Sequence, residues 1–104
     1  MTHLQPAYMV AYVDTENPPR HMPIDFPRGA QVAVRTASLD GLFHYGEPKK
    51  IAYEDIPVLL FQLADAGYTI EPGDRLFPGI KSFKAYSPEF VRRVREFAAN
   101  GMKS

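Results

Sequence analysis

The most apolar run in this chain of 104 residues extends from Asp55 to Gly67, and any fold has to bury most of it. Asp55 can accept hydrogen bonds from the free amide groups of a first helical turn, and Pro57 removes no intrahelical donor there. Gly67 suits the left-handed conformation that ends many helices. The two ends therefore predict a helix over residues 55–67.

Apolar side chains cover more than half of the circumference of this helix when it turns 100° per residue. They are Ile56, Leu59, Leu60, Phe61, Leu63, Ala64 and Ala66. A helix that packs on one sheet needs less apolar surface than this. The excess predicts either a helix held between the sheet and another part of the chain, or one whose outer face meets a partner or a second copy.

The composition is that of an ordinary globular domain, with 45% hydrophobic and 23% charged residues. The length allows a modest core without a metal or a disulfide. No cysteine is present, which excludes disulfide bonds, thiolate zinc sites and a cysteine nucleophile. The first residues show no basic segment followed by an apolar one, and no run approaches the roughly 18 apolar residues of a membrane span. We expect one soluble, cytoplasmic domain over residues 1–104.

Several segments have the residue pattern of strands. Residues 7–13 are apolar at both odd and even positions, which predicts a strand covered on both faces and central in its sheet. Residues 31–37 alternate as a half-buried strand does, and the Asp-Gly pair at 40–41 is favoured in tight turns. Residues 42–45 would then return antiparallel and complete a β-hairpin. A short strand over residues 68–70 follows the helix.

The C-terminal part predicts further extended pieces and a second helix. Residues 80–86 form one or two short extended segments. Ser87 is a helix N-cap and Pro88 a favoured first helical residue, and the helix would run to about Ala99. Its apolar side chains fall within about 120° as one stripe, formed by Phe90, Val91, Val94, Phe97 and Ala98.

The order strand, long loop, β-hairpin, helix, short strand, helix predicts an α+β domain with a small, mainly antiparallel sheet. We expect both helices to pack on one face of that sheet. The last helix would then lie beside the first and cover the apolar surface that the sheet does not reach. This arrangement would bury the wide apolar arc of residues 55–67 without a partner.

Charged residues are sorted along the chain, although the formal net charge is zero. Residues 54–74 carry five acidic side chains and no basic one, whereas residues 75–104 carry seven basic and two acidic side chains. Three explanations remain open: two surfaces of a self-complementary contact, a basic face for an anionic partner, or neutralisation inside one fold.

The segment over residues 16–29 contains four prolines, each of which removes a donor and favours extended geometry before it. It predicts a long, stiff loop. Arg20, His21, Phe26 and Arg28 would form a basic and apolar binding edge on it, because long loops in compact domains are often functional. A strap packed over one end of the sheet explains the same residues equally well.

His44 is the best single candidate for acid-base or ligand chemistry, because it is the only histidine in an expected strand. Tyr45 and Tyr53 would line a pocket beside it. No histidine spacing of a metal site, no serine elbow and no glycine-rich phosphate loop occurs. The sequence therefore predicts no catalytic residue, no metal and no cofactor.

Arg92 and Arg95 on the last helix are the main nucleic-acid signal, since arginines on one helix face can contact phosphates. Glutamates share that face, and the isoelectric point near 6.8 is far below that of a basic nucleic-acid-binding domain.

The sequence as a whole favours a small non-catalytic binding module that recognises another protein or a second copy of itself. The contact would use the loop of residues 16–29 or the outer face of the first helix. A small-molecule-binding protein or small enzyme with a pocket near His44 is the first alternative. A weak nucleic-acid binder that uses Arg92 and Arg95 is the second. No membrane partner is expected.

Overall fold

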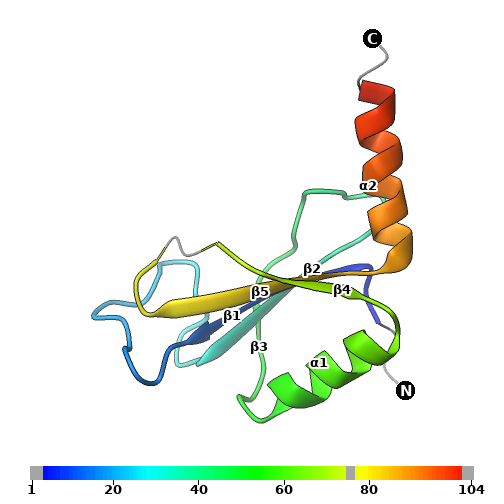
Figure 1. Cartoon of the computed structure of the whole chain (residues 1–104). Helices are drawn as coiled ribbons and strands as arrows, with labels where there is room; N and C mark the ends of the chain where they lie inside the picture. Colours follow the sequence, from blue (N-terminus) through cyan, green and yellow to red (C-terminus); the bar gives the residue numbers. More distant parts are fainter. Residues whose placement is uncertain (1–3, 75–76, 102–104) are drawn as a thin grey trace.

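The structure, a computed structural model, describes residues 4–74 and 77–101. Within them, five strands form one antiparallel sheet in the order β3-β2-β1-β5-β4, and two helices pack on it (Figure 1). The elements in chain order are β1 (Ala7–Val13), β2 (Val32–Ala37), β3 (Lys49–Lys50), α1 (Asp55–Asp65), β4 (Thr69–Pro72), β5 (Ile80–Tyr86) and α2 (Pro88–Gly101). This architecture confirms the predicted α+β fold class. No helix in the described part of the chain is long and apolar enough to cross a membrane.

Strand β1 is the centre of the sheet, as its apolar residues at both parities predict. It pairs with β2 on one side, where Val10 lies opposite Val34, and with β5 on the other, where Val10 lies opposite Phe83. Both faces of β1 are covered at its first residues, because Ala7 and Val10 point to opposite faces and are both fully buried. Strand β5 is one continuous strand of seven residues rather than the short extended pieces that we expected.

The β-hairpin joins β2 to β3, but its turn differs from the expected Asp-Gly turn. The Oγ of Ser38 accepts a hydrogen bond from the amide of Gly41 at 3.1 Å, and the amide of His44 then bonds to the Gly41 carbonyl at 2.9 Å. These local bonds hold residues 38–44 in two successive turns instead of a returning strand. The amide of Gly46 bonds to the carbonyl of Thr36 at 2.9 Å, and β3 then pairs antiparallel with β2, with Lys49 opposite Val34.

Helix α1 buries one side against the sheet. Ile56 and Leu63 pack into a core cluster with Val10 and Phe83. The side chain of Glu54, which precedes the helix, makes no capping hydrogen bond, so the expected cap at Asp55 is wrong and Asp55 is instead the first helical residue.

The C-terminal end of α1 matches the prediction. Gly67 is left-handed with φ of 82°. Its amide bonds to the carbonyl of Ala64 at 3.1 Å, and the amide of Tyr68 bonds to the carbonyl of Leu63 at 2.9 Å. This pair of bonds is the Schellman motif, in which glycine avoids the clash that a side chain would cause.

Helix α2 lies over the face of the sheet opposite α1, which corrects the expectation of two helices on one face (Figure 1). The reason is the single residue, Ser87, between β5 and α2. Its Oγ accepts a hydrogen bond from the amide of Phe90 at 3.0 Å, which confirms the predicted N-cap. Such a short link places Phe90 on the face where Tyr86 points, and the two rings stack with centroids 5.5 Å apart.

Each helix therefore keeps apolar surface that the other does not cover. On α1, Val58 is 56% exposed and Phe61 is 73% exposed. On α2, Phe90 is 3% exposed, whereas Phe97, two turns further along the same stripe, is 61% exposed. Figure 1 shows why: α1 runs along the sheet, while α2 leaves the sheet after its first turns.

Candidate functional site

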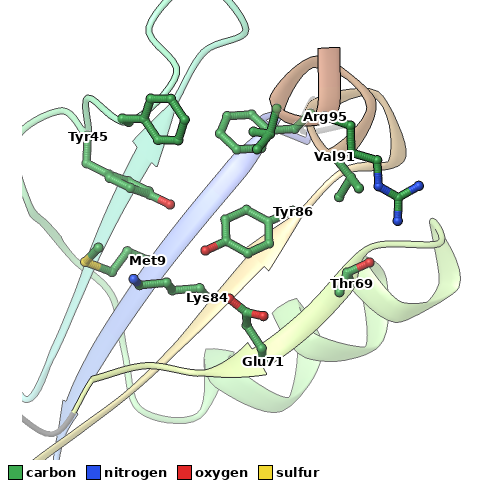
Figure 2. A pocket seen from close by; sticks show the side chains of 11 residues that line it. Met9, Tyr45, Thr69, Glu71, Lys84, Tyr86, Val91 and Arg95 are labelled. Atoms are coloured by element: carbon green, nitrogen blue, oxygen red, sulfur yellow. The ribbon is translucent and has the colours of Figure 1, made fainter. Parts of the chain in front are cut away.

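A cleft of about 670 Å³ lies between α2 and the face of the sheet opposite α1 (Figure 2). Three strands, the loop after β2 and the first turns of α2 form its walls. The residues that line it are Met9, Phe43, Tyr45, Thr69, Glu71, Lys84, Tyr86, Phe90, Val91, Val94 and Arg95. Most of these side chains are aromatic or aliphatic, and three are charged.

The register of the sheet brings the floor of the cleft together from distant parts of the sequence. Lys84 on β5 lies opposite Met9 on β1 and opposite Glu71 on β4. Tyr86 lies opposite Thr69 in the same way. Because side chains alternate between the faces of a sheet, these five residues share the face that α1 leaves uncovered.

Tyr86 lies in the middle of the cleft, with its ring against Phe90. Burial raises the pKa of the Tyr86 hydroxyl well above its usual value, and interactions with Tyr45 and Glu71 raise this pKa further. Burial also raises the pKa of Tyr45. The two hydroxyls interact with each other, and that of Tyr86 also interacts with Glu71. A raised pKa is the opposite of what a tyrosine base would need.

The charged groups of the cleft leave one cation without an internal partner. The Nζ of Lys84 lies 3.9 Å from the Oδ2 of Asp74, a long and partly exposed ion pair. Arg95 makes no ion pair with any residue that the structure describes. Figure 2 shows its guanidinium group extending past Val91 toward Thr69 at the mouth of the cleft. This mouth is therefore suited to a carboxylate or another anion.

Phe43 extends the apolar wall of the cleft outward along α2. Its ring contacts that of Phe97 edge-on, with centroids 5.6 Å apart, and both rings are largely exposed. The backbone of Phe43 is left-handed with φ of 73°, a conformation that bulky residues rarely adopt. Such strained residues concentrate at functional sites. The turn after β2 thus holds an aromatic ring in a costly position beside the cleft.

The structure divides the predicted loop site in two. Arg20 and His21 line a hollow of about 440 Å³, while Phe26 and Arg28 line another of about 560 Å³. The loop packs closely against the end of the sheet, since a side chain at Gly79 would clash with the backbone of Pro19. These contacts fit the strap interpretation. The four residues do not form one continuous binding edge.

His44 and its expected neighbours are separated. His44 is exposed in the loop after β2 and lines none of the three hollows described here. Tyr53 lies on the α1 side, where its ring contacts Tyr12 and its hydroxyl donates to the carbonyl of Val13 at 2.7 Å. Of the three, Tyr45 alone reaches the cleft.

The two arginines of the expected basic surface also have different surroundings. Arg92 forms ion pairs with Glu89 at 3.7 Å and with Glu96 at 3.5 Å on the exposed side of α2. Arg95 lines the cleft instead. Arg75 and Lys103, which belong to the basic block of the sequence, lie outside the described residues.

Sequence reasoning missed most of the cleft, including Met9, Glu71, Lys84 and Tyr86. One sequence signal for the cleft was available. Side chains alternate between the two faces of a strand, so a strand over residues 80–86 places Lys84 and Tyr86 on the same face. Among residues 4–74 and 77–101, no group of three or more histidine and acidic side chains could hold a metal ion.

Compared with known protein families, with curated proteins and with solved structures, the chain matches none of them. The geometry of the cleft and of the two helices is therefore the basis for assigning a function.

Proposed function

We propose that this protein is a non-catalytic binding module that recognises another protein through α2 and the sheet face beneath it. The observation that carries this proposal is one continuous apolar surface. It begins in the cleft above Phe90, at Val91 and Val94, and continues outward through the exposed rings of Phe43 and Phe97. From Phe90 to Phe97 the helix rises about 10 Å, which extends the surface well beyond the sheet.

Exposed aromatic rings of this kind have a cost in a free domain and are typical of protein-binding surfaces. The left-handed backbone of Phe43 adds to this cost. A partner that covers the two rings would offset both costs. The partner would supply apolar side chains for the stripe and an acidic side chain for Arg95, which has no ion pair of its own among the described residues.

The cleft on its own has the volume of a small-molecule pocket, which typically measures about 300–1,000 Å³. This observation favours small-molecule binding as a second candidate. The protein-binding proposal has more support, because a small molecule in the cleft would leave Phe97 exposed. Enzyme activity near His44 has less support, because His44 lies outside the cleft and the cleft tyrosines have raised pKa values.

A photo-crosslinking amino acid at position 97 tests the proposal, and the same amino acid at position 24 is the matched control. Ile24 is fully exposed, but it lies on the proline-rich loop. We expect an adduct of one defined mass from position 97 in extracts of the native host. Unlabelled wild-type protein should compete for this adduct, whereas the Phe97→Asp variant should not.

The proposal fails if position 24 alone gives an adduct, because the loop would then be the binding surface. It also fails if neither position gives one. In that case, small-molecule binding in the cleft becomes the leading function.

A further inference from the structure

The outer face of α1 carries an apolar pair between two acidic residues. Glu54, Val58, Phe61 and Asp65 follow one another at intervals of four, three and four residues, so they share one side of the helix. All four are exposed. Neither acid makes an ion pair with a described residue.

The distal part of α2 carries basic residues beside an apolar pair, whereas α1 carries acidic residues at the two ends of one. Val94 and Phe97 form its apolar pair, with the same spacing as Val58 and Phe61 on α1. Arg93 and Arg95 lie on the two flanks of this stripe, because residues two apart on a helix are separated by about 200°. Neither arginine is ion-paired within the described residues.

We propose that the partner of α2 is a second copy of this chain, which presents the outer face of its α1. This inference rests on the proposed role of α2 as a docking surface. Valine and phenylalanine of one helix pack against valine and phenylalanine of the other, as side-chain ridges do at helix contacts. The acids lie along the α1 axis and the arginines lie across the α2 axis, so the two helices cross steeply. Glu54 and Asp65 of one copy then pair with Arg93 and Arg95 of the other.

The distribution of charge favours a second copy over an unrelated protein. The α1 segment belongs to a block of residues, 54–74, that has acidic but no basic side chains. Contact between two α2 helices would oppose arginines, and contact between two α1 helices would oppose acids. Of these three helix pairs, only α1 with α2 brings opposite charges together. The zero formal net charge means that two copies do not repel each other overall.

The arrangement of the helices allows the contact to be made twice. Figure 1 shows that α1 lies along one face of the sheet and ends near the place where α2 begins on the opposite face. A two-fold axis beside that place brings each α1 near the α2 of the other copy, and the contact closes as a dimer.

Two charge-reversed variants of the full chain test this inference. Variant one carries Glu54→Arg and Asp65→Arg, and variant two carries Arg93→Glu and Arg95→Glu. All four positions are exposed, so both variants should fold, which circular dichroism verifies. We expect sedimentation to show a wild-type dimer that salt weakens, and a dissociation constant raised at least about tenfold in each variant alone.

The equimolar mixture of the two variants is the decisive sample. In it, each helix of variant one meets a helix of opposite charge on variant two, so the mixed dimer should regain the wild-type affinity. A matched control for variant one carries Glu16→Arg and Glu47→Arg, which change the net charge by the same amount and sign at exposed loop positions, and it should leave the dimer intact.

The inference is overturned if the wild type stays a monomer at all concentrations, or if its dimer survives both reversals. Failure of the mixture to associate also overturns it. Crosslinking from position 97 separates the two proposals. If the wild type is a monomer and position 97 still labels a different protein, only the second-copy partner is wrong. If neither association nor labelling occurs, the proposed function fails as well.

Discussion

The two helices of this protein resemble each other in sequence and differ in surroundings. Each carries a valine and an exposed phenylalanine three residues apart, and each begins beside the sheet. Helix α1 lies along the sheet and buries Leu63 completely, whereas α2 buries only Phe90 and then leaves the sheet. Amphipathic pattern alone does not decide how much of a helix is covered. The length and direction of the preceding connection decide it here.

The largest expected effect is the loss of stability when a residue on the side of α1 that faces the sheet is truncated. Leu63→Ala removes a side chain that is 0% exposed, and it should lower the free energy of unfolding by about 3 kcal/mol. Phe61→Ala, two residues away on the outer side of α1, should change it by less than about 0.5 kcal/mol. Urea unfolding at low protein concentration measures both, because dilution keeps association from adding stability. Equal losses would show that both sides of α1 are covered.

The next effect compares two phenylalanines on the same stripe of α2. Phe90→Ala should cost about 2 kcal/mol, which is below the usual range for buried phenylalanine because its half-buried neighbours can move into the space. Phe97→Ala should cost less than about 0.5 kcal/mol, since it removes one exposed contact with Phe43. The same urea experiment tests this pair. A large loss for Phe97→Ala would mean that the distal half of α2 is packed in the isolated chain.

The features that the sequence predicted correctly depend on short-range chemistry. The cap at Ser87 and the left-handed Gly67 involve hydrogen bonds within a few residues, and residue type alone specifies them. The central position of β1 followed from its apolar residues at both parities.

Some features that the sequence did not predict depend on side chains that compete for backbone hydrogen bonds. Others depend on the register between strands that are distant in the sequence. Ser38 captures the amide of Gly41 and displaces the expected tight turn. The cleft needs Met9, Glu71 and Lys84 side by side, which only the pairing of three strands provides. The face occupied by α2 depends on the one-residue link at Ser87, and the apolar stripe of α2 carries no information about that link.

A smaller effect compares how the two helices begin. Ser87→Ala removes the hydroxyl that accepts from the Phe90 amide, and it should lower stability by about 1 kcal/mol. Glu54→Ala at the start of α1 should have almost no effect, because its side chain makes no capping hydrogen bond. Thermal unfolding of both variants at low protein concentration, where association adds no stability, measures the difference. A cost at Glu54 equal to that at Ser87 would contradict the assignment of the two caps.

The smallest effect at neutral pH concerns the tyrosines of the two faces, and it becomes visible only in alkali. Burial, followed by interactions with Tyr45 and Glu71, raises the pKa of Tyr86 in the folded chain above its usual value near 10. The folded state therefore keeps this proton at pH values where the unfolded chain has lost it. Stability is fully present below pH 10 and falls as the pH rises beyond it.

Burial also raises the pKa of Tyr53, on the α1 side. Because Tyr86 has the larger shift, Tyr86→Phe should reduce the alkaline loss more than Tyr53→Phe does. Circular dichroism and the absorbance of ionised tyrosine, followed between pH 9 and about 12, measure this loss. If Tyr53→Phe has the larger effect, then the cleft face is the more solvated of the two, and the aromatic cluster around Tyr86 is not the preformed surface that the binding proposal requires.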